Sequence, residues 1–100
     1  MKLIFLILIQ LITLIHTQSL DKIKIIDVRV NGNVRIADED ILRNAKLWPE
    51  KEITIDDIQK SINYLWKLGR FSDVQIFVEE ETISGVKLLI DLKELKILDS

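Results

Sequence analysis

The segment that most constrains the fold is Ile58–Val78, because its pattern changes from helical to extended within a few residues. Its first half has apolar residues at the spacing of one helical face, namely Ile58, Ile62, Leu65 and Trp66. Gly69 then suits the left-handed conformation that often ends a helix. From Phe71 onward apolar residues occupy alternate positions, as in a half-buried strand. The segment therefore predicts a helix that leads directly into a strand of the sheet it covers.

The N-terminus carries an apolar run, Leu3–Ile15, which follows Lys2. Thirteen residues are too few for an ordinary bilayer span of roughly 20, but they suit the apolar part of a secretory signal. Small residues around Ser19 place the predicted cleavage after it. Residues 1–19 are therefore predicted to be a signal peptide, and residues 20–100 a single domain. The alternative is an uncleaved N-terminal anchor, and either reading exports the rest of the chain.

Composition excludes several classes of function. The chain has no cysteine, so a disulfide scaffold and thiol chemistry are excluded. Its only histidine, His16, lies in the predicted signal, which removes histidine-assisted nucleophilic catalysis from the domain. A net charge of −2 without a basic stripe argues against nucleic acid as a partner. No glycine-rich phosphate loop or calcium loop is present. We therefore predict no enzyme activity, no catalytic, cofactor or metal site, and no small-molecule substrate.

Two further stretches alternate between apolar and polar residues and are predicted to be strands. In Lys22–Val30, Ile25 falls on the outward side, opposite Ile26, Val28 and Val30. In Val86–Lys93, Leu89 falls on the outward side. On the strand that follows Gly69, Phe77 also points outward. If the register brings these residues together, Ile25, Phe77 and Leu89 form a small apolar patch on the uncovered face of the sheet.

Helix signals lie between the first and second strands. Asp38–Lys46 has an acidic start, which suits the positive end of the helix dipole. A second helix is predicted to begin at Thr54, where Asp57 completes a variant capping box. Pro49–Glu52 is predicted to be a loop, and Glu79–Gly85 a polar turn.

The predicted order is strand, helix, helix, strand, strand, an α+β fold of the β-α-α-β-β type. The last two strands pair antiparallel across a short turn, and the first strand joins the sheet by a crossover. The result is a three-stranded mixed sheet with two helices packed on one face. Placing the last strand in the centre makes Phe71–Glu80 an edge strand.

The motifs in this order resemble those of a known family. The Gly-Asn-x-Arg element at Gly32–Arg35, the Leu-Trp-x-x-Gly-x-Phe element at Leu65–Phe71 and a final strand ending in Glu94 are similar to POTRA domains. These are the polypeptide-transport-associated domains of BamA-type outer-membrane protein assembly factors. The resemblance extends over about residues 23–97. It departs from the family at Trp66, where tyrosine is usual, at Ala37, where a capping serine or threonine is usual, and at Lys96, where proline is common.

The resemblance implies a non-enzymatic binding module in the periplasm, associated with the outer membrane if it is part of a longer assembly factor. Its expected partners are unfolded outer-membrane proteins or assembly-complex subunits, and neighbouring POTRA domains if the chain continues. An exposed edge strand offers unpaired backbone groups to an extended peptide. The residues predicted to bind partners are Val74, Gln75, Ile76, Phe77, Val78, Ile25 and Leu89.

A second function remains open from the sequence. POTRA-like domains also occur in membrane-anchored cell-division and secretion proteins, where the resemblance implies a structural role in organising partners. In such a protein the N-terminal segment is an uncleaved anchor, so an intact Met1 in the mature protein distinguishes this alternative.

Overall fold

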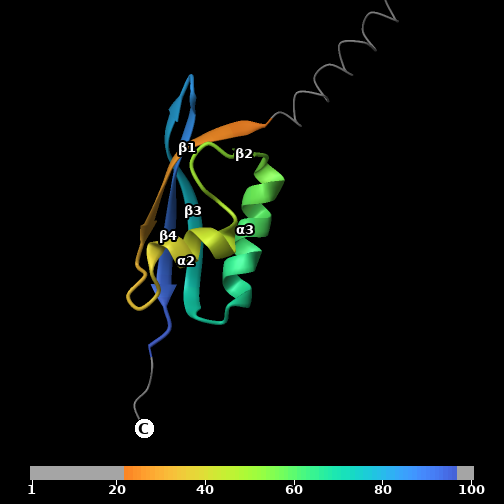
Figure 1. The fold of residues 1–100 in the computed structure, drawn as a ribbon. Helices are drawn as coiled ribbons and strands as arrows, with labels where there is room; N and C mark the ends of the chain where they lie inside the picture. Colours follow the sequence, from red (N-terminus) through yellow and green to blue (C-terminus); the bar gives the residue numbers. More distant parts are fainter. Residues whose placement is uncertain (1–21, 97–100) are drawn as a thin grey trace, which may run out of the picture.

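Strands and helices make up most of residues 22–96, the part of the chain that the computed structural model describes (Figure 1). The elements are β1 (Ile23–Asn31), α2 (Asp38–Ala45), β2 (Glu52–Ile53), α3 (Ile55–Lys67), β3 (Phe71–Thr82) and β4 (Gly85–Glu94). The predicted signal peptide, residues 1–19, lies outside the described residues. Within residues 22–96, no helix has both the length and the apolar character needed to cross a membrane.

The last strand, β4, lies inside the sheet, as predicted. The strand order is β2-β1-β4-β3, with β4 parallel to β1 and antiparallel to β3. A parallel pair needs a long connection, and both helices lie in the chain between β1 and β4. The predicted α+β class and the place of β3 at one end of the sheet are confirmed.

The predicted number of strands was wrong, because the sheet has four. The additional strand is β2, which begins at Glu52, the last residue of the expected loop. It pairs antiparallel with β1 through Ile23–Ile53 and Lys24–Glu52. Backbone hydrogen bonds extend the contact, with the Ile25 N–H donating to the Lys51 carbonyl at 2.8 Å. The burial of Ile53, which is only 1% exposed, explains why this short segment is held against β1. A two-residue strand is too short to show alternation in a sequence.

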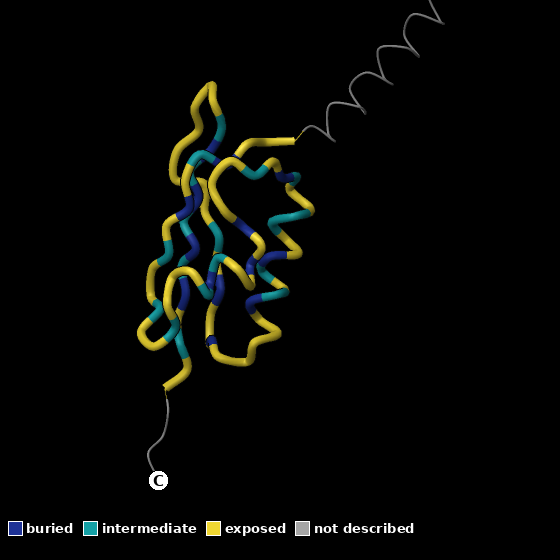
Figure 2. The backbone as a smooth tube through the Cα atoms, viewed as in Figure 1, coloured by how far each residue is buried: buried dark blue, intermediate teal, exposed yellow. Residues whose placement is uncertain are grey.

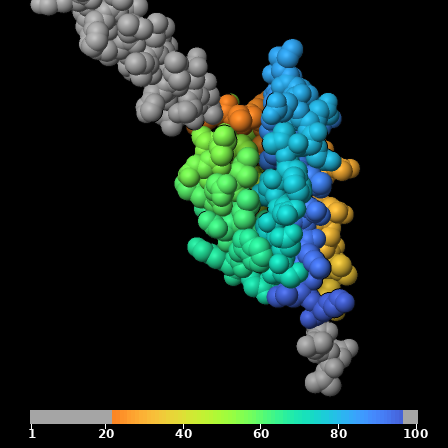
Figure 3. Space-filling model, turned by 180° about the vertical axis from the view of Figure 1, so that it is seen from behind, coloured from red at the N-terminus to blue at the C-terminus, as the bar shows by residue number. Residues whose placement is uncertain are grey.

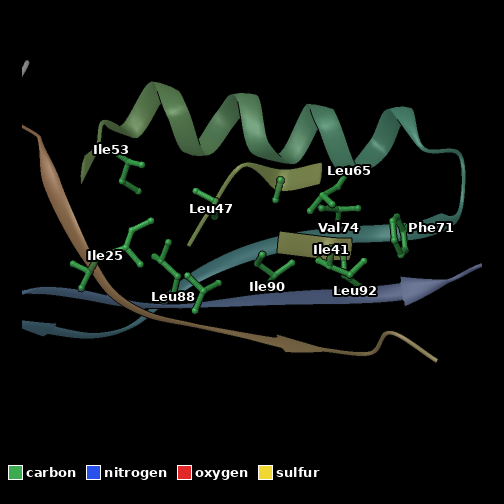
Figure 4. Close-up of a cluster of buried hydrophobic side chains, with 13 residues drawn as sticks. Ile25, Ile41, Leu47, Ile53, Leu65, Phe71, Val74, Leu88, Ile90 and Leu92 are labelled. Carbon is green, nitrogen blue, oxygen red and sulfur yellow. The ribbon is translucent and has the colours of Figure 1, made fainter. Parts of the chain in front are cut away.

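Both helices pack on one face of the sheet and enclose an apolar core (Figure 4). Figure 2 shows that the buried positions are shared among the sheet strands, both helices and the segment between them. In the described part of the chain, the buried apolar residues of this core are Ile25, Val28, Ile41, Ala45, Leu47, Ile53, Leu65, Phe71, Val74, Val86, Leu88, Ile90 and Leu92.

The contact between α2 and α3 is made where both helices carry a small residue. Ala45 of α2 is fully buried, and Ser61 of α3 is 2% exposed. The Ser61 hydroxyl donates a hydrogen bond to the Ala45 carbonyl at 2.6 Å, and it also lies 3.0 Å from the Asp57 carbonyl. The buried hydroxyl therefore has a hydrogen-bond acceptor. In turn, it supplies a donor to one of the backbone carbonyls that have no partner within the helix at the end of α2.

Trp66 corrects the prediction for the buried face of α3. Leu65 is fully buried, but Trp66 is 43% exposed, and Ile58 and Ile62 are only partly buried. Consecutive residues of a helix point about 100° apart, so a helix that directs Leu65 into the core turns Trp66 toward the border of its buried face. The apolar spacing identified the helix correctly and overestimated the width of its buried face.

The capping predictions are confirmed. At the start of α3 the Asp57 N–H donates to Thr54 Oγ1 at 3.2 Å, and the Thr54 N–H donates to Asp57 Oδ2 at 2.8 Å. The backbone hydrogen bond from Thr54 is the largest cause that lowers the pKa of the Asp57 carboxyl. At the start of α2, Ala37 provides no side-chain cap. Gly69 has φ of +67° directly after the end of α3, as its place in the sequence predicted.

The Gly-Asn-x-Arg element forms the connection between β1 and α2, and Glu94 holds it against the end of β4. Glu94 accepts hydrogen bonds from the backbone N–H groups of Val34 and Arg35, the latter at 2.8 Å. Gly32 has φ of +86°, and a Cβ there would lie 1.8 Å from the Leu92 carbonyl oxygen. Only glycine allows the backbone at position 32 to lie this close to β4. Gly32 and Glu94, which are far apart in the sequence, therefore both hold the β1–α2 connection against β4.

Candidate functional site

The candidate site is the free edge of β3. Among the described residues β3 pairs with β4 alone, so its other side has no strand partner. The pairing is regular from Asp73, opposite Lys93, to Val78, opposite Leu88. It is interrupted on both sides, between Phe71 and Asp73 and between Val78 and Glu80. The regular stretch contains Val74–Val78, all predicted to bind partners, and extends for about 20 Å at the usual rise of a strand.

The faces of β3 alternate as predicted along this stretch. Val74 is 6% exposed and Ile76 packs against the core, so both point toward the helices. Gln75 and Phe77 lie on the other face, and Phe77 is 45% exposed. A strand added beside β3 would meet an apolar row on one face and a more polar row on the other.

Val78 shares the helix-facing side of β3 with Val74, but it is 47% exposed. The lengths of the elements explain its exposure. The 13 residues of α3 extend for about 20 Å, whereas the 12 residues of β3 extend for about 40 Å. The hairpin of β3 and β4 therefore extends past the N-terminal end of α3, the end next to β2 (Figure 1). Seen from behind, β3 lies uncovered beside α3 and continues to the tip of the hairpin (Figure 3).

On the face of the sheet away from the helices, Phe77 and Leu89 lie opposite each other in the β3–β4 register. Arg29 of β1 lies opposite Leu89 on its other side. The predicted neighbourhood of Phe77 and Leu89 is therefore confirmed. Leu89 is half-buried, so the apolar surface here comes mainly from Phe77.

Ile25 does not join this patch, and its predicted outward orientation was wrong. Its side chain is fully buried in the core. The β1–β4 register shifts between Ile25 and Asp27, so Ile26 is an additional residue on β1. Such a bulge offsets the alternation by one residue, which brings Ile25 and Val28 to the same face. A site that uses the sheet edge cannot include Ile25 in this conformation.

Acidic residues mark the far end of the edge, and the predicted strand was too short there. The edge strand was expected to end at Glu80, within a turn predicted for Glu79–Gly85, but β3 continues to Thr82. The antiparallel partner strand carried the missing signal, because its alternating pattern after Gly85 requires a partner of matching length. Glu79 and Glu80 pair with Arg29 and Lys87 at 2.9 Å and 3.2 Å.

The β3 edge presents backbone groups rather than a cluster of titratable side chains. Across residues 22–96 there is no group of three His, Cys, Asp or Glu side chains that could hold a metal ion. Glu94, one of four side chains with a shifted pKa among residues 22–96, has a structural role. Burial acts to raise the pKa of Glu94, but hydrogen bonds from the N–H groups of Arg35, Val34 and Ile36 outweigh it, so the pKa lies below its ordinary value. What the β3 edge offers a ligand is backbone hydrogen bonding.

Comparison with known proteins gives the family. The family model described as POTRA, surface antigen variable number repeat, matches residues 23–95. A comparison with curated proteins found no match. The match to the family model extends over well over half of the chain and includes all six strands and helices.

Solved structures share the fold. The POTRA1-2 segment of the periplasmic domain of Omp85 from Anabaena superposes with a TM-score of 0.67 at 22% identity, over 78% of this chain and 50% of that chain. The N-terminal domain of Omp85 from Thermosynechococcus elongatus gives 0.65 at 22% identity, over 74% and 31%. The POTRA1-3 segment from Anabaena gives 0.65 at 22% identity, over 78% and 32%. This chain thus spans about a third to a half of the length of these structures. With its strand order, its motif residues and the family match in agreement, the chain belongs to the POTRA family.

Proposed function

We propose that this domain is a non-catalytic binding module that holds extended polypeptide segments on the free edge of β3. The observation that carries the proposal is the regular stretch Asp73–Val78, which is paired with β4 on one side only. Every second residue of an unpaired edge strand points its backbone N–H and C=O away from the sheet, and an extended peptide can satisfy these groups by adding a strand. The affinity then comes mainly from the backbone.

Several features make this edge suited to strand addition. β3 contains no proline, so each of its residues keeps its N–H. Val74 and Ile76 supply an apolar row beside α3, and Val78 extends it into the exposed part of the hairpin. The bulges at the two ends limit the regular stretch to about six residues. A short edge of this kind favours transient contacts with many sequences over tight binding of one.

Family membership supports the choice of partners. The structures that share this fold are described as parts of the periplasmic and N-terminal domains of Omp85. We therefore propose that the domain acts in the periplasm, associated with the outer membrane as part of a longer assembly factor. Its partners would be unfolded outer-membrane proteins, assembly-complex subunits or neighbouring POTRA domains.

A site-specific cross-linking experiment tests the proposal. A photo-reactive amino acid replaces Gln75, which is exposed on β3, and in a matched control it replaces Asn63, which is exposed on α3. The full chain is then mixed with an outer-membrane β-barrel protein diluted from urea, and illuminated. We expect cross-links from position 75 and few from position 63. Equal yields from both positions would contradict binding at the β3 edge.

A further inference from the structure

The charge of β3 points to the kind of segment that the edge accepts. Its 12 residues include four acids, Asp73 and Glu79–Glu81, and no basic residue. The acids lie on both sides of the apolar stretch Val74–Val78. Charged residues that flank an edge are also a common protection against uncontrolled pairing. Here all of them have the same sign, so they discriminate between segments that could add to the edge.

Two of the four acids are available to a ligand. Glu79 and Glu80 are already engaged, in ion pairs with Arg29 and Lys87. Asp73 and Glu81 are exposed and take part in none of the ion pairs among residues 22–96. Lys93 lies opposite Asp73 in the register, but their side chains form no ion pair. The distance along the strand from Asp73 to Glu81 is about 27 Å at the usual rise per residue.

We propose that the β3 edge selects extended segments with alternating apolar residues and a lysine or arginine at each end, about eight residues apart. This inference rests on the proposed function and adds a charge preference to it. The apolar residues would lie beside Val74 and Ile76, and the two cations beside Asp73 and Glu81. Because an acid lies at each end of the apolar stretch, the preference is the same for either direction of the added strand.

The same charges disfavour a second copy of this chain as the occupant. Pairing the β3 edges of two copies would bring four acids of one strand next to four acids of the other. Like charges on neighbouring strands are destabilising. The edge is therefore protected against self-association and stays open to a cationic segment.

The test uses two nine-residue peptides with alternating valine and threonine between their ends, one with lysine and one with glutamate at both ends. Each carries a fluorophore, and its binding to the full chain in a mild detergent is followed by anisotropy, with detergent alone as the blank. At low salt we expect the lysine peptide to bind about tenfold more tightly than the glutamate peptide. The reason is that two exposed attractive contacts in the first complex are replaced by two repulsive ones in the second. High salt should reduce the ratio.

Variants assign the preference to β3. The double variant D73N/E81Q should reduce the ratio between the peptides to about twofold. A matched control, E39Q/D56N, removes two exposed acids from the helices and should keep the tenfold ratio. Salt dependence of the unaltered chain provides an independent measurement if the double variant does not fold.

Peptides methylated on alternate backbone nitrogens separate this inference from the proposed function. An added strand bonds to β3 through one alternate set of its N–H groups only, so methylation of that set should abolish binding and methylation of the other set should not. If the two sets behave differently but the lysine and glutamate peptides bind equally, the charge preference is wrong and the edge function stands. If binding is insensitive to methylation of either set, the edge function is wrong, and the inference falls with it.

Discussion

Arg29 of β1 reaches across the central strand β4 and binds Glu79 of β3 with both ends of its guanidinium fork. The Arg29 Nε–H and terminal N–H donate to the two Glu79 carboxylate oxygens at 3.0 Å and 2.9 Å. Glu79 lies where the β3–β4 register shifts, so this ion pair holds the bulged residue toward the sheet. The pair thereby marks the end of the regular edge that we assign to binding.

Removing this pair should weaken the domain modestly. Arg29→Ala is expected to lower the free energy of unfolding by about 1 kcal/mol, because two-point geometry strengthens a pair that is otherwise partly exposed. Urea denaturation followed by tryptophan fluorescence measures the change. In a double-mutant cycle with Glu79→Gln, the coupling between the two residues should decrease at high salt. A coupling of zero at low salt would show that the pair contributes nothing.

Two glycines should respond differently to the same substitution. Gly32→Ala places a Cβ 1.8 Å from the Leu92 carbonyl at φ of +86°, and should cost more than about 3 kcal/mol. Gly69→Ala meets no atom within 4 Å, and its cost should be about 1 kcal/mol, from the positive φ alone. Both are measured by thermal or urea unfolding. Equal costs would contradict the close approach of Gly32 to β4.

Leu65 and Trp66 provide a similar comparison on α3. Leu65→Ala should destabilise the domain by about 2–5 kcal/mol, because it leaves a cavity in a fully buried position. Trp66→Ala should cost less, about 1 kcal/mol, because 43% of that side chain is already exposed. Urea denaturation of both variants tests the order, and a larger loss for Trp66→Ala would contradict the placement of α3 on the sheet.

Glu94 should make stability depend on pH. Its folded-state pKa is lowered, because hydrogen bonds from the 34–36 backbone outweigh the effect of burial. A lowered pKa means that the ionised form stabilises the folded state, so its contribution is present above the ordinary pKa of 4.5 and is lost as pH falls through the folded-state value. At neutral pH, Glu94→Gln should cost about 1 kcal/mol.

The pH profile supplies the control for Glu94. The difference in unfolding free energy between the original chain and Glu94→Gln should shrink as the pH is lowered below the ordinary glutamate pKa. Glu39→Gln, at an exposed position of α2, should change stability by less than about 0.5 kcal/mol at neutral pH. A cost for Glu94→Gln that stays constant down to the acid-unfolding range would contradict the role of the charged form.

Much of the fold could be predicted from the sequence, because local signals and the global fold agree. Thr54 and Asp57 form the expected capping box, Gly69 ends α3, and alternation placed β3 and β4 side by side. The errors occur where alternation is interrupted or absent. A bulge after Ile25 turns that residue into the core, whereas Val28 and Val30 keep the inward side that alternation predicted, and β2 is too short to alternate.

The candidate site was predicted in part. The stretch Val74–Val78 was identified as an edge, because the order of elements leaves few arrangements of the sheet. Of its acidic continuation, Glu79 and Glu80 were assigned both to the end of the strand and to the turn, and Glu81 to the turn alone, since strongly polar residues are typical of turns and rare in buried strands. These residues can extend β3 because the hairpin reaches beyond the helices, and residues 79–82 of β3 are all exposed there.

Amide hydrogen exchange of the full chain with and without a bound strand peptide tests the central claim most directly. If a strand adds to β3, alternate amides within Asp73–Val78 should exchange more slowly in the complex, because only every second N–H faces the free edge. Amides of β4, already paired on both sides, should change little. Slower exchange confined to another surface, with the amides of Asp73–Val78 unchanged in a saturated complex, would contradict the account.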